Sequence, residues 1–291
     1  AAKNSYITGV TASTNFPTTA GAYDVTHNGG NDGFVTKLNS TGTALLYSTF
    51  IGSAGTDESN FLYVTPTNEV WIAGITTNAA FPITAGAIDA TFAGAGEAFL
   101  AKFNATGTSL LYSTFYGGAG DDAFVCLRPS GVNELIAIGT TSSDNTGNAI
   151  ATAGAFQTTR SGTALNGMLM KFNTSTNTRT WGTYINPTAG GDLTLTCGQV
   201  DNGGNIYFGG HTPGVVAACI TAGVYDASFN GGGRDFYLGK INAAGSSLLA
   251  GTYIGGNAAE TNLMGLNIDD FGKVYAFGYT NSSSPSLSTT N

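Results

Sequence analysis

The sequence has few charged residues, and few of these are basic. Charged residues make up 10% of the 291, and ten Lys and Arg stand against 18 Asp and Glu, which gives a formal net charge of −8. Binding to nucleic acid needs clustered Lys and Arg to meet the phosphates, so we expect no nucleic-acid partner. The acidity is expected to act mainly on solubility.

Long apolar stretches are also missing. No run approaches the about 20 apolar residues of a membrane-spanning helix, so no membrane insertion is expected. The first residues, AAKNSYITG, lack the apolar region of a secretory signal peptide. We therefore expect a mature form or an excised piece of a longer protein.

Cysteine is scarce as well. Cys126, Cys197 and Cys219 are too few for a disulfide scaffold and do not have a metal-ligand spacing. At least one of them must lie outside any disulfide within the chain. Cys197 and Cys219 could pair if neighbouring strands bring them together, but buried free thiols are favoured because Cys packs as a small apolar residue.

The common catalytic signatures are absent. The sequence has no G-x-S-x-G, no H-E-x-x-H, no G-x-x-x-x-G-K-[ST], and only two histidines, His27 and His211. Paired carboxylates are present, but in so acidic a chain they are weak evidence for general acid/base catalysis. We therefore predict that the protein is not an enzyme.

Glycine, by contrast, is abundant, with 43 residues, and together with many Thr, Ser and Asn it is typical of a turn-rich β protein. One stretch, DGFVTKLNSTGTALLYSTFIG at 32–52, returns in related form from Glu97, Asn166 and Asp235. Each copy has two alternating apolar segments around a turn containing Asn and in most copies Gly, which predicts a β-hairpin. The repeat lysines lie 65, 69 and 69 residues apart: Lys37, Lys102, Lys171 and Lys240.

Two further strands are predicted before this hairpin, whose own strands we label C and D. Strand B ends in glycine and occurs at 5–9, 70–74, 135–139, 206–210 and 274–278, and strand A precedes four of these, from Asn60, Ala123, Leu193 and Asn262. Four short antiparallel strands in each 65–69 residues predict a β-propeller blade. A solenoid repeat would be shorter, and an immunoglobulin-like sandwich would need about 100 residues.

The predicted fold class is therefore all-β, a β-propeller with four blade equivalents and a partial fifth. We expect a single propeller domain over 1–291, which can belong to a larger chain, with repeats at about 4–58, 59–122, 123–192, 193–260 and 261–291. The first repeat lacks strand A and the last lacks strands C and D. We expect either a larger ring with further blades outside this sequence, or a subunit whose strand edges a neighbouring chain completes.

The succession of motifs resembles the bacterial β-propeller repeat called SBBP. The matching segments are Asn205–Gly210, Phe16–Tyr23, Asp32–Asn39 and Leu110–Asp122, and the resemblance covers nearly the whole chain. The third repeat departs most, with FNTSTNTRTWGTYINPTAGG in place of the usual turn and strand. The resemblance implies a secreted or cell-surface propeller and implies no particular chemistry.

Carboxylates follow strand D in every repeat, and they are the candidate metal ligands. They are Asp57, Glu58, Asp121, Asp122, Asp192 and Glu260. Two or more carboxylates in a flexible turn would suit calcium. The favoured alternative is an acidic residue that accepts backbone N–H bonds and fixes one blade against the next, because no turn has the spaced acids of a dedicated calcium loop. We thus predict that no cofactor is required and keep calcium as an optional ligand.

The repeat lysines and asparagines are further candidates. The lysines could form a ring of positive charge, but their recurrence favours a structural role, each paired with a repeated acid such as Asp32, Glu97 or Asp235. The candidate glycosylation sites are Asn39, Asn104, Asn173 and Asn281. Asn is also simply a good turn residue.

The long connections after strand B, at about 10–31, 75–96, 140–165 and 211–233, are predicted to lie on one face, where recognition is often placed. Their aromatic side chains could stack on sugars or on another protein: Phe16, Tyr23, Phe81, Phe92, Phe156, Tyr225 and Phe229. The repeated Thr-Ala-Gly core within them favours instead the packing of each loop onto its own blade.

We therefore expect a non-enzymatic extracellular or cell-surface propeller that acts as a structural or binding module, in an adhesin or a surface fibre. Its expected partners are other proteins, surface glycans or copies of itself joined through unpaired strand edges. The competing hypothesis is a polysaccharide-active enzyme that uses surface carboxylates such as Asp121 and Asp122.

Overall fold

The computed structural model describes residues 3–146, 150–160, 165–186 and 192–283. Its strands, in chain order, are β1 (Ser5–Thr11), β2 (Asp32–Leu38), β3 (Leu45–Ile51), β4 (Asp57–Val64), β5 (Val70–Thr76), β6 (Glu97–Phe103), β7 (Leu110–Tyr116), β8 (Asp122–Gly131), β9 (Glu134–Thr141), β10 (Asn166–Asn173), β11 (Thr178–Ile185), β12 (Thr194–Val200), β13 (Ile206–Thr212), β14 (Asp235–Ile241), β15 (Leu248–Ile254), β16 (Glu260–Ile268) and β17 (Val274–Thr280). A short 3-10 helix, η2, covers Ala217–Cys219. None of the helices in the described part of the chain has the length and apolar character needed to cross a membrane.

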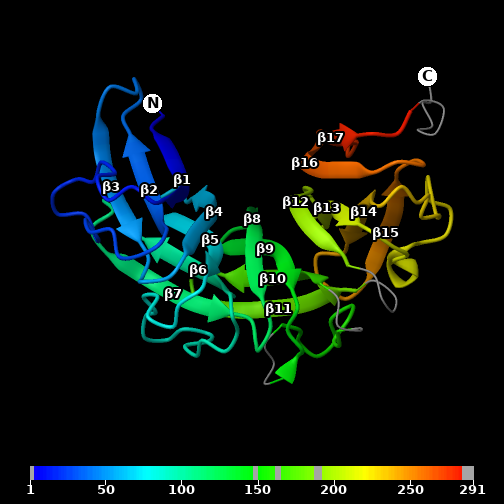
Figure 1. Ribbon diagram of the computed structural model, residues 1–291, viewed down its shortest axis with the longest axis horizontal. Coiled ribbons are helices and arrows are strands. Elements are labelled where there is room, and N and C mark those ends of the chain that lie inside the picture. The colour runs from blue at the N-terminus through cyan, green and yellow to red at the C-terminus, as the bar shows by residue number, and fades with distance from the viewer. Residues whose placement is uncertain (1–2, 147–149, 161–164, 187–191, 284–291) are drawn as a thin grey trace. The chain divides into compact units, whose positions relative to one another are not determined.

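The strands form antiparallel sheets in which neighbours in sequence are neighbours in space (Figure 1). The sheets are β1-β2-β3, β4-β5-β6-β7, β8-β9-β10-β11, β12-β13-β14-β15 and β16-β17. Three of them have the complete A-B-C-D order, while the first lacks strand A and the last lacks strands C and D. The predicted all-β fold, built of four-stranded propeller blades, is confirmed.

The blades share one register as well as one topology. In the second blade Thr76 pairs with Glu97, and in the fourth Thr212 pairs with Asp235 at the same place. The pairing of strands C and D shifts by one residue next to the repeat lysine in all four blades that have both strands. Such a bulge bends the strand before its turn, so the lysine marks a repeated structural irregularity.

Strand A begins earlier than the apolar pattern predicts. Asp57, Asp122 and Glu260 are the first residues of β4, β8 and β16, so these acids belong to the strand and not to the turn before it. The backbone N–H of Asp57 donates to the carbonyl of Asn31 at 2.8 Å, just before strand C of the preceding blade. A hydrogen bond between blades thus places each of these acids beside the start of a strand C.

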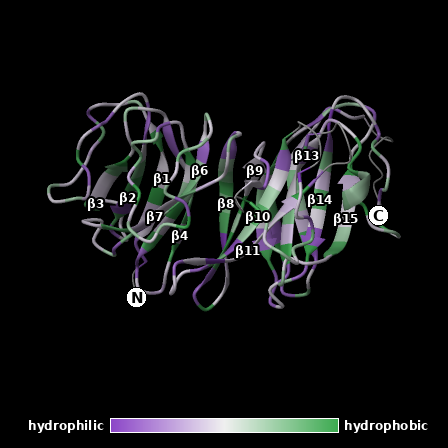
Figure 2. Ribbon diagram, turned by 90° about the horizontal axis from the view of Figure 1, so that it is seen from below, coloured by the Kyte–Doolittle hydropathy of each residue, from purple (hydrophilic) through white to green (hydrophobic). Residues whose placement is uncertain are grey.

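The chain divides into two compact units, residues 1–127 and 128–291, and each is described by itself. In the first unit β4 packs against β1 and β2. The core between the two blades includes Val35, Ile51, Val70 and Phe99, which are all fully buried. In the second unit β12 packs against β9, and β16 packs against β12 and β13. Hydrophobic residues lie along the strands of each sheet (Figure 2). Packing of strand A onto the preceding sheet is how propeller blades bury both faces.

Candidate functional site

Three pairs of buried carboxylates lie where the start of one strand C meets the start of the next strand A. They are Asp32 with Asp57, Glu97 with Asp122, and Asp235 with Glu260. All six residues are at most 1% exposed. A methyl group on Gly52 would lie 2.7 Å from Asp32 Oδ1 and 3.0 Å from Asp57 Oδ2, and one on Gly117 would clash with both Glu97 and Asp122. Glycine at the end of strand D therefore leaves room for the two carboxylates.

One oxygen of each strand C acid accepts backbone N–H groups from the loop before it. Asp32 Oδ2 accepts from Asn28 at 2.7 Å, and Asp235 Oδ2 accepts from Asn230 at 2.8 Å. Glu97 Oε1 accepts from two successive residues, at 2.9 and 3.1 Å. These bonds fix the end of the long connection onto its own blade.

The strand A acids make equivalent bonds to the turn that links two blades. Asp57 Oδ2 accepts from the N–H and the hydroxyl of Ser53, at 2.6 and 3.1 Å. Asp122 Oδ2 accepts from the N–H of Gly118 at 3.0 Å, and Glu260 Oε2 accepts from that of Gly256 at 3.2 Å. These contacts support the structural role that we favoured for the repeated acids.

The second oxygens of these acids differ in their partners, and Glu260 Oε1 accepts the hydroxyls of Thr280 at 2.8 Å and Ser282 at 2.6 Å. Asp32 Oδ1, Asp57 Oδ1, Glu97 Oε2 and Asp235 Oδ1 are buried and have no hydrogen-bond partner among the described residues. Burial raises the pKa of Glu97 to about 7, with the Asp122 carboxylate adding to the shift. Burial likewise raises the pKa of Asp235 to about 6, helped by Glu260 and Asp226. Burial and a neighbouring carboxylate thus both favour the protonated form of Glu97 and of Asp235.

The remaining junction, between the third and fourth blades, has neither acid. Asn166 starts strand C, and Leu193 makes the backbone bond to Leu165 at 2.8 Å that Asp57, Asp122 and Glu260 make elsewhere. Leu193 therefore occupies the strand A acid position. Asp192 precedes it, is exposed, and accepts the N–H of Leu165 at 2.8 Å.

Two other predicted ligands also lie outside the pairs. Glu58 is half-buried and Asp121 is exposed, next to Asp57 and Asp122 respectively. Within residues 3–146, 150–160, 165–186 and 192–283, no three or more His, Cys, Asp or Glu side chains come together as a metal-binding group. The structure therefore brings the strand A acids together with the strand C acids, which the sequence analysis had assigned to the lysines.

That assignment of the lysines is wrong. Lys102 Nζ pairs with Glu69 at 2.7 Å, Lys171 with Glu134 at 2.8 Å and Lys240 with Asp201 at 3.4 Å. Lys37 Nζ lies 5.1 Å from the centre of the Tyr6 ring, on the neighbouring strand B. Lys37, Lys102 and Lys240 are each five residues beyond the acid that starts their strand. Five residues span about 16 Å at 3.3 Å per residue, so the lysine and the acid lie at opposite ends of the blade.

The long connections are fastened to strand D of their own blade. Thr84 donates its N–H to the carbonyl of Ser113 at 3.2 Å, and its hydroxyl accepts the N–H of Ser113 at 2.8 Å. Thr19, Thr152 and Thr221 make the same pair of bonds in the other blades.

The aromatic residues of these loops pack inward in most cases. Phe16 lies 4.4 Å from Phe34 and Phe81 lies 4.4 Å from Phe99, between ring centres. Tyr23, Phe92 and Phe229 also contact rings of the strands. Phe156 is half-buried, and its N–H donates to Gly245 at 2.8 Å. Tyr225, by contrast, is 56% exposed.

Three of the four candidate glycosylation asparagines form hydrogen bonds within their own turns. Asn39 Oδ1 accepts the N–H of Thr43 at 2.9 Å, and its Nδ2 donates to the hydroxyl of the same residue at 3.0 Å. Asn104 repeats this arrangement, and Asn173 Oδ1 accepts from Ser175. Asn281 is exposed after β17. The amide nitrogen that a sugar would occupy is therefore a hydrogen-bond donor in two of the four turns.

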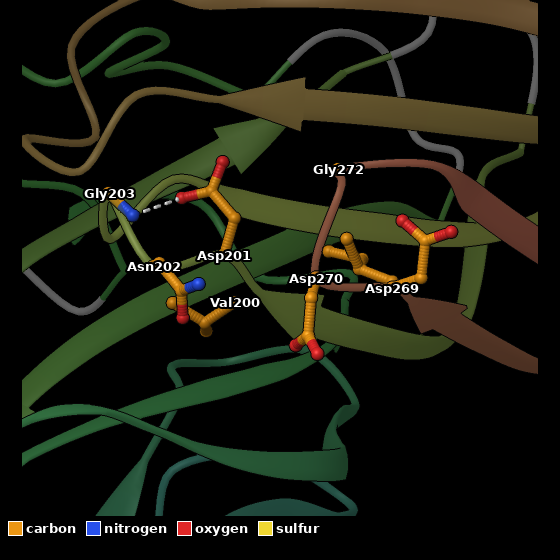
Figure 3. A pocket seen from close by; sticks show the side chains of 8 residues that line it. Val200, Asp201, Asn202, Gly203, Asp269, Asp270 and Gly272 are labelled. Carbon is orange, nitrogen blue, oxygen red and sulfur yellow. Dashed lines mark hydrogen bonds between the residues drawn. The ribbon is translucent and has the colours of Figure 1, made fainter.

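An acidic pocket of about 250 Å³ lies between two A–B turns of the second unit (Figure 3). Asp201, Asp269 and Asp270 line it. Although burial opposes the shift, hydrogen bonds from Asn205 and the Lys240 ammonium hold the pKa of Asp201 below its usual value. Asp269 caps its own turn by accepting the N–H of Lys273 at 2.8 Å. Of the three, Asp270 is exposed.

The last sheet presents an aromatic surface. Every residue of β17 is exposed, among them Tyr275, Phe277 and Tyr279 at 56 to 62%. One edge of β17 pairs with β16, and no strand of the described chain pairs with the other edge. An edge of this kind offers unpaired N–H and C=O groups to another strand.

No protein-family model matches the sequence, and no curated protein matches it. Among solved structures, the fold is similar to hydrazine synthase from Kuenenia stuttgartiensis, with 13% identity, coverage of 85% of this chain and 70% of that one, and a TM-score of 0.40. It is also similar to the Dos1 propeller (12% identity, coverage 84% and 60%, TM-score 0.37) and to a phage phi92 endosialidase (11%, 90% and 39%, 0.39). This chain thus spans 60% of the Dos1 propeller chain and 39% of the endosialidase chain.

Proposed function

We propose that the protein is a non-enzymatic structural or binding module of an extracellular or cell-surface protein, and that β17 docks a β-strand of a protein partner. The observation that carries this proposal is the exposed aromatic strand with one unpaired edge. Backbone hydrogen bonds to that edge supply affinity, and the aromatic side chains supply contact area. The resemblance to SBBP repeats supports the extracellular placement.

The use of the repeated polar residues supports a non-enzymatic role. The buried acids hold turns and blade junctions, and three of the four repeat lysines pair with acids of their own blades. The loop threonines fasten the long connections. Repeated side chains are thus committed to the scaffold, which leaves the variable surface for recognition.

The test is the mass of the protein in solution, measured by size-exclusion chromatography with light scattering over a range of concentrations. We expect concentration-dependent assembly that Phe277→Lys and Tyr279→Lys abolish, because charge on an edge strand opposes strand pairing. Phe271→Lys, in the turn before β17 and 90% exposed, is the matched control and should leave assembly unchanged. A compact monomer at every concentration would contradict the proposal for copies of this chain.

A glycan screen for binding and for cleavage tests the non-enzymatic part separately. We expect no turnover of any polysaccharide. Cleavage that Asp122→Asn or Asp270→Asn removes would show a carboxylate-dependent enzyme and overturn this part of the proposal.

A further inference from the structure

The other strands B show what kind of strand belongs beside β17. β1, β5, β9 and β13 each pair with the strand C of their own blade, antiparallel and in one register. With strand C in place, β5 is buried along nearly its whole length, whereas every residue of β17 is exposed. The edge of β17 that the described chain leaves unpaired is therefore the one that a strand C occupies in the other blades.

The register of an incoming strand follows from the fourth blade. Val274 pairs with Ile268 as Ile206 pairs with Val200, which aligns β17 with β13. Three residue types then coincide: Tyr275, Gly278 and Thr280 in β17 stand where β13 has Tyr207, Gly210 and Thr212. In the fourth blade these three pair with a lysine, an aromatic residue and an acid of strand C: Lys240, Tyr237 and Asp235.

The lysine of strand C is held by a turn acid and an aromatic ring. Lys240 Nζ lies 3.4 Å from Asp201 Oδ2, in the A–B turn, and 4.5 Å from the centre of the Tyr207 ring. The equivalent residues of the second blade are Lys102, Glu69 and Trp71, with distances of 2.7 and 5.5 Å. A carboxylate and the face of a ring both attract an ammonium group, so the two together form a lysine site.

The last sheet has this lysine site already assembled. Asp269 Oδ1 accepts the N–H groups of Phe271 and Lys273 at 3.0 and 2.8 Å, as Asp201 Oδ1 accepts those two and four residues further on, at 2.9 Å each. Asp269 Oδ2 accepts the Tyr275 hydroxyl at 3.2 Å, which places the ring beside the acid. None of the ion pairs found among the described residues involves Asp269.

A second copy of this chain does not offer a matching strand. β2, β6, β10 and β14 carry the repeat lysines, and each already lies between a strand B and a strand D. No strand at a sheet edge of the described chain contains a lysine. The lysine site therefore points to a strand of a different protein.

We propose that the strand docked at β17 belongs to a partner protein and carries the pattern acid-x-aromatic-x-x-Lys. It runs antiparallel to β17, with its acid opposite Thr280, its aromatic residue opposite Gly278 and its lysine opposite Tyr275. The lysine ammonium lies between the Asp269 carboxylate and the Tyr275 ring. This inference rests on the docking at β17 proposed above and adds the chemistry that selects the partner.

The experiment measures binding of a fluorescent synthetic peptide, with the sequence of residues 235–254, to the full chain by fluorescence anisotropy. This peptide has the required pattern and a following strand D. A second peptide carries Lys240→Met, which keeps the length of the side chain and removes its charge. We expect the lysine peptide to bind about tenfold more tightly, from one ion pair and one cation–π contact.

Variants of the full chain locate the lysine site. Asp269→Asn should remove most of the preference for the lysine peptide and leave the affinity of the methionine peptide unchanged, because asparagine keeps the Oδ1 acceptor that holds the turn. Asp270→Asn is the matched control and should keep the full preference. It removes the same charge from the next residue, where the fourth blade has Asn202. Circular dichroism checks that both variants are folded.

Equal binding of the two peptides to the wild type would overturn this inference and leave docking at β17 intact, as would a preference that a folded Asp269→Asn variant retains. If neither peptide binds while the full chain assembles in a way that Phe277→Lys abolishes, the occupant of β17 is a second copy and the lysine pattern is wrong. If neither peptide binds and the chain stays monomeric at every concentration, this inference and the docking at β17 both fail.

Discussion

His211 is a buried histidine of the second unit, and its surroundings disfavour its protonated form. It is 8% exposed, its Nε2 accepts from Arg234 Nη1 at 3.2 Å, and its Nδ1 has no partner among the described residues. Burial lowers the pKa of His211, and the Arg234 charge lowers it further. A protonated His211 would be shielded from water and would lie beside the positive charge of Arg234.

The stability of the protein should therefore depend on this one imidazole in mildly acidic solution. In the unfolded chain His211 takes up a proton near its usual pKa of about 6.5, whereas in the folded protein it does so only at lower pH. The unfolded state then binds more protons, so this contribution to stability is complete above about pH 6.5 and is lost as the pH falls below it. His211→Gln should reduce the drop in urea midpoint between pH 7.5 and 5.5. An unchanged drop would contradict the prediction.

At the scale of the element, glycine in the C–D turns allows a backbone with positive φ and, in the second blade, close contact with the preceding blade. Gly42 and Gly107 occupy the same turn position with φ of 71° and 68°. A methyl group on Gly42 would meet nothing within 4 Å, whereas one on Gly107 would run into the Tyr47 ring of the preceding blade. The turn of the second blade thus also packs against the first.

These two glycines form a matched pair for mutation. Gly42→Ala should cost about 1 kcal/mol, the usual penalty of a side chain at positive φ. Gly107→Ala should cost about 1 to 3 kcal/mol more, because the methyl group also forces the blades apart. Urea denaturation of the two variants measures the difference. Equal losses would show that the turn does not contribute to packing between the blades.

The hairpin pattern and the lysine spacing predicted the elements well, because alternating apolar residues and Asn-Gly turns act locally. The strand C acids were misassigned because side-chain partners depend on which end of the blade a residue occupies, and Lys37 and Asp32 lie at opposite ends. Asp192 was aligned with Asp57 because it is the acid that follows strand D in its repeat. The bond of Leu193 to Leu165 shows that Leu193 is the true equivalent, and this repeat has two more residues after strand D than the others. Asn28, Ser53 and the glycines at the acid pairs gave no signal, because their roles depend on how the loops and the neighbouring blade pack against the acids.

On the scale of the whole molecule, the thiols report on global opening. Cys126, Cys197 and Cys219 are buried and form no disulfide, as favoured from the sequence. Burial raises the pKa of Cys219 to about 12, so its reactive thiolate is scarce at neutral pH. We expect no rapid reaction with a thiol reagent at pH 8 and three reactive thiols in denaturant. Fast modification of even one native thiol would show local opening of a blade.

The junction of Asn166 and Leu193 shows how a blade interface can be built without buried acids. Asn166, Asn186 and Leu193 are buried at the positions where the other junctions have two acids and a glycine. Transplanted together to positions 32, 52 and 57, they should make an interface whose stability no longer depends on the protonation of Asp32 and Asp57. Transplanted singly, they would leave one orphaned carboxylate.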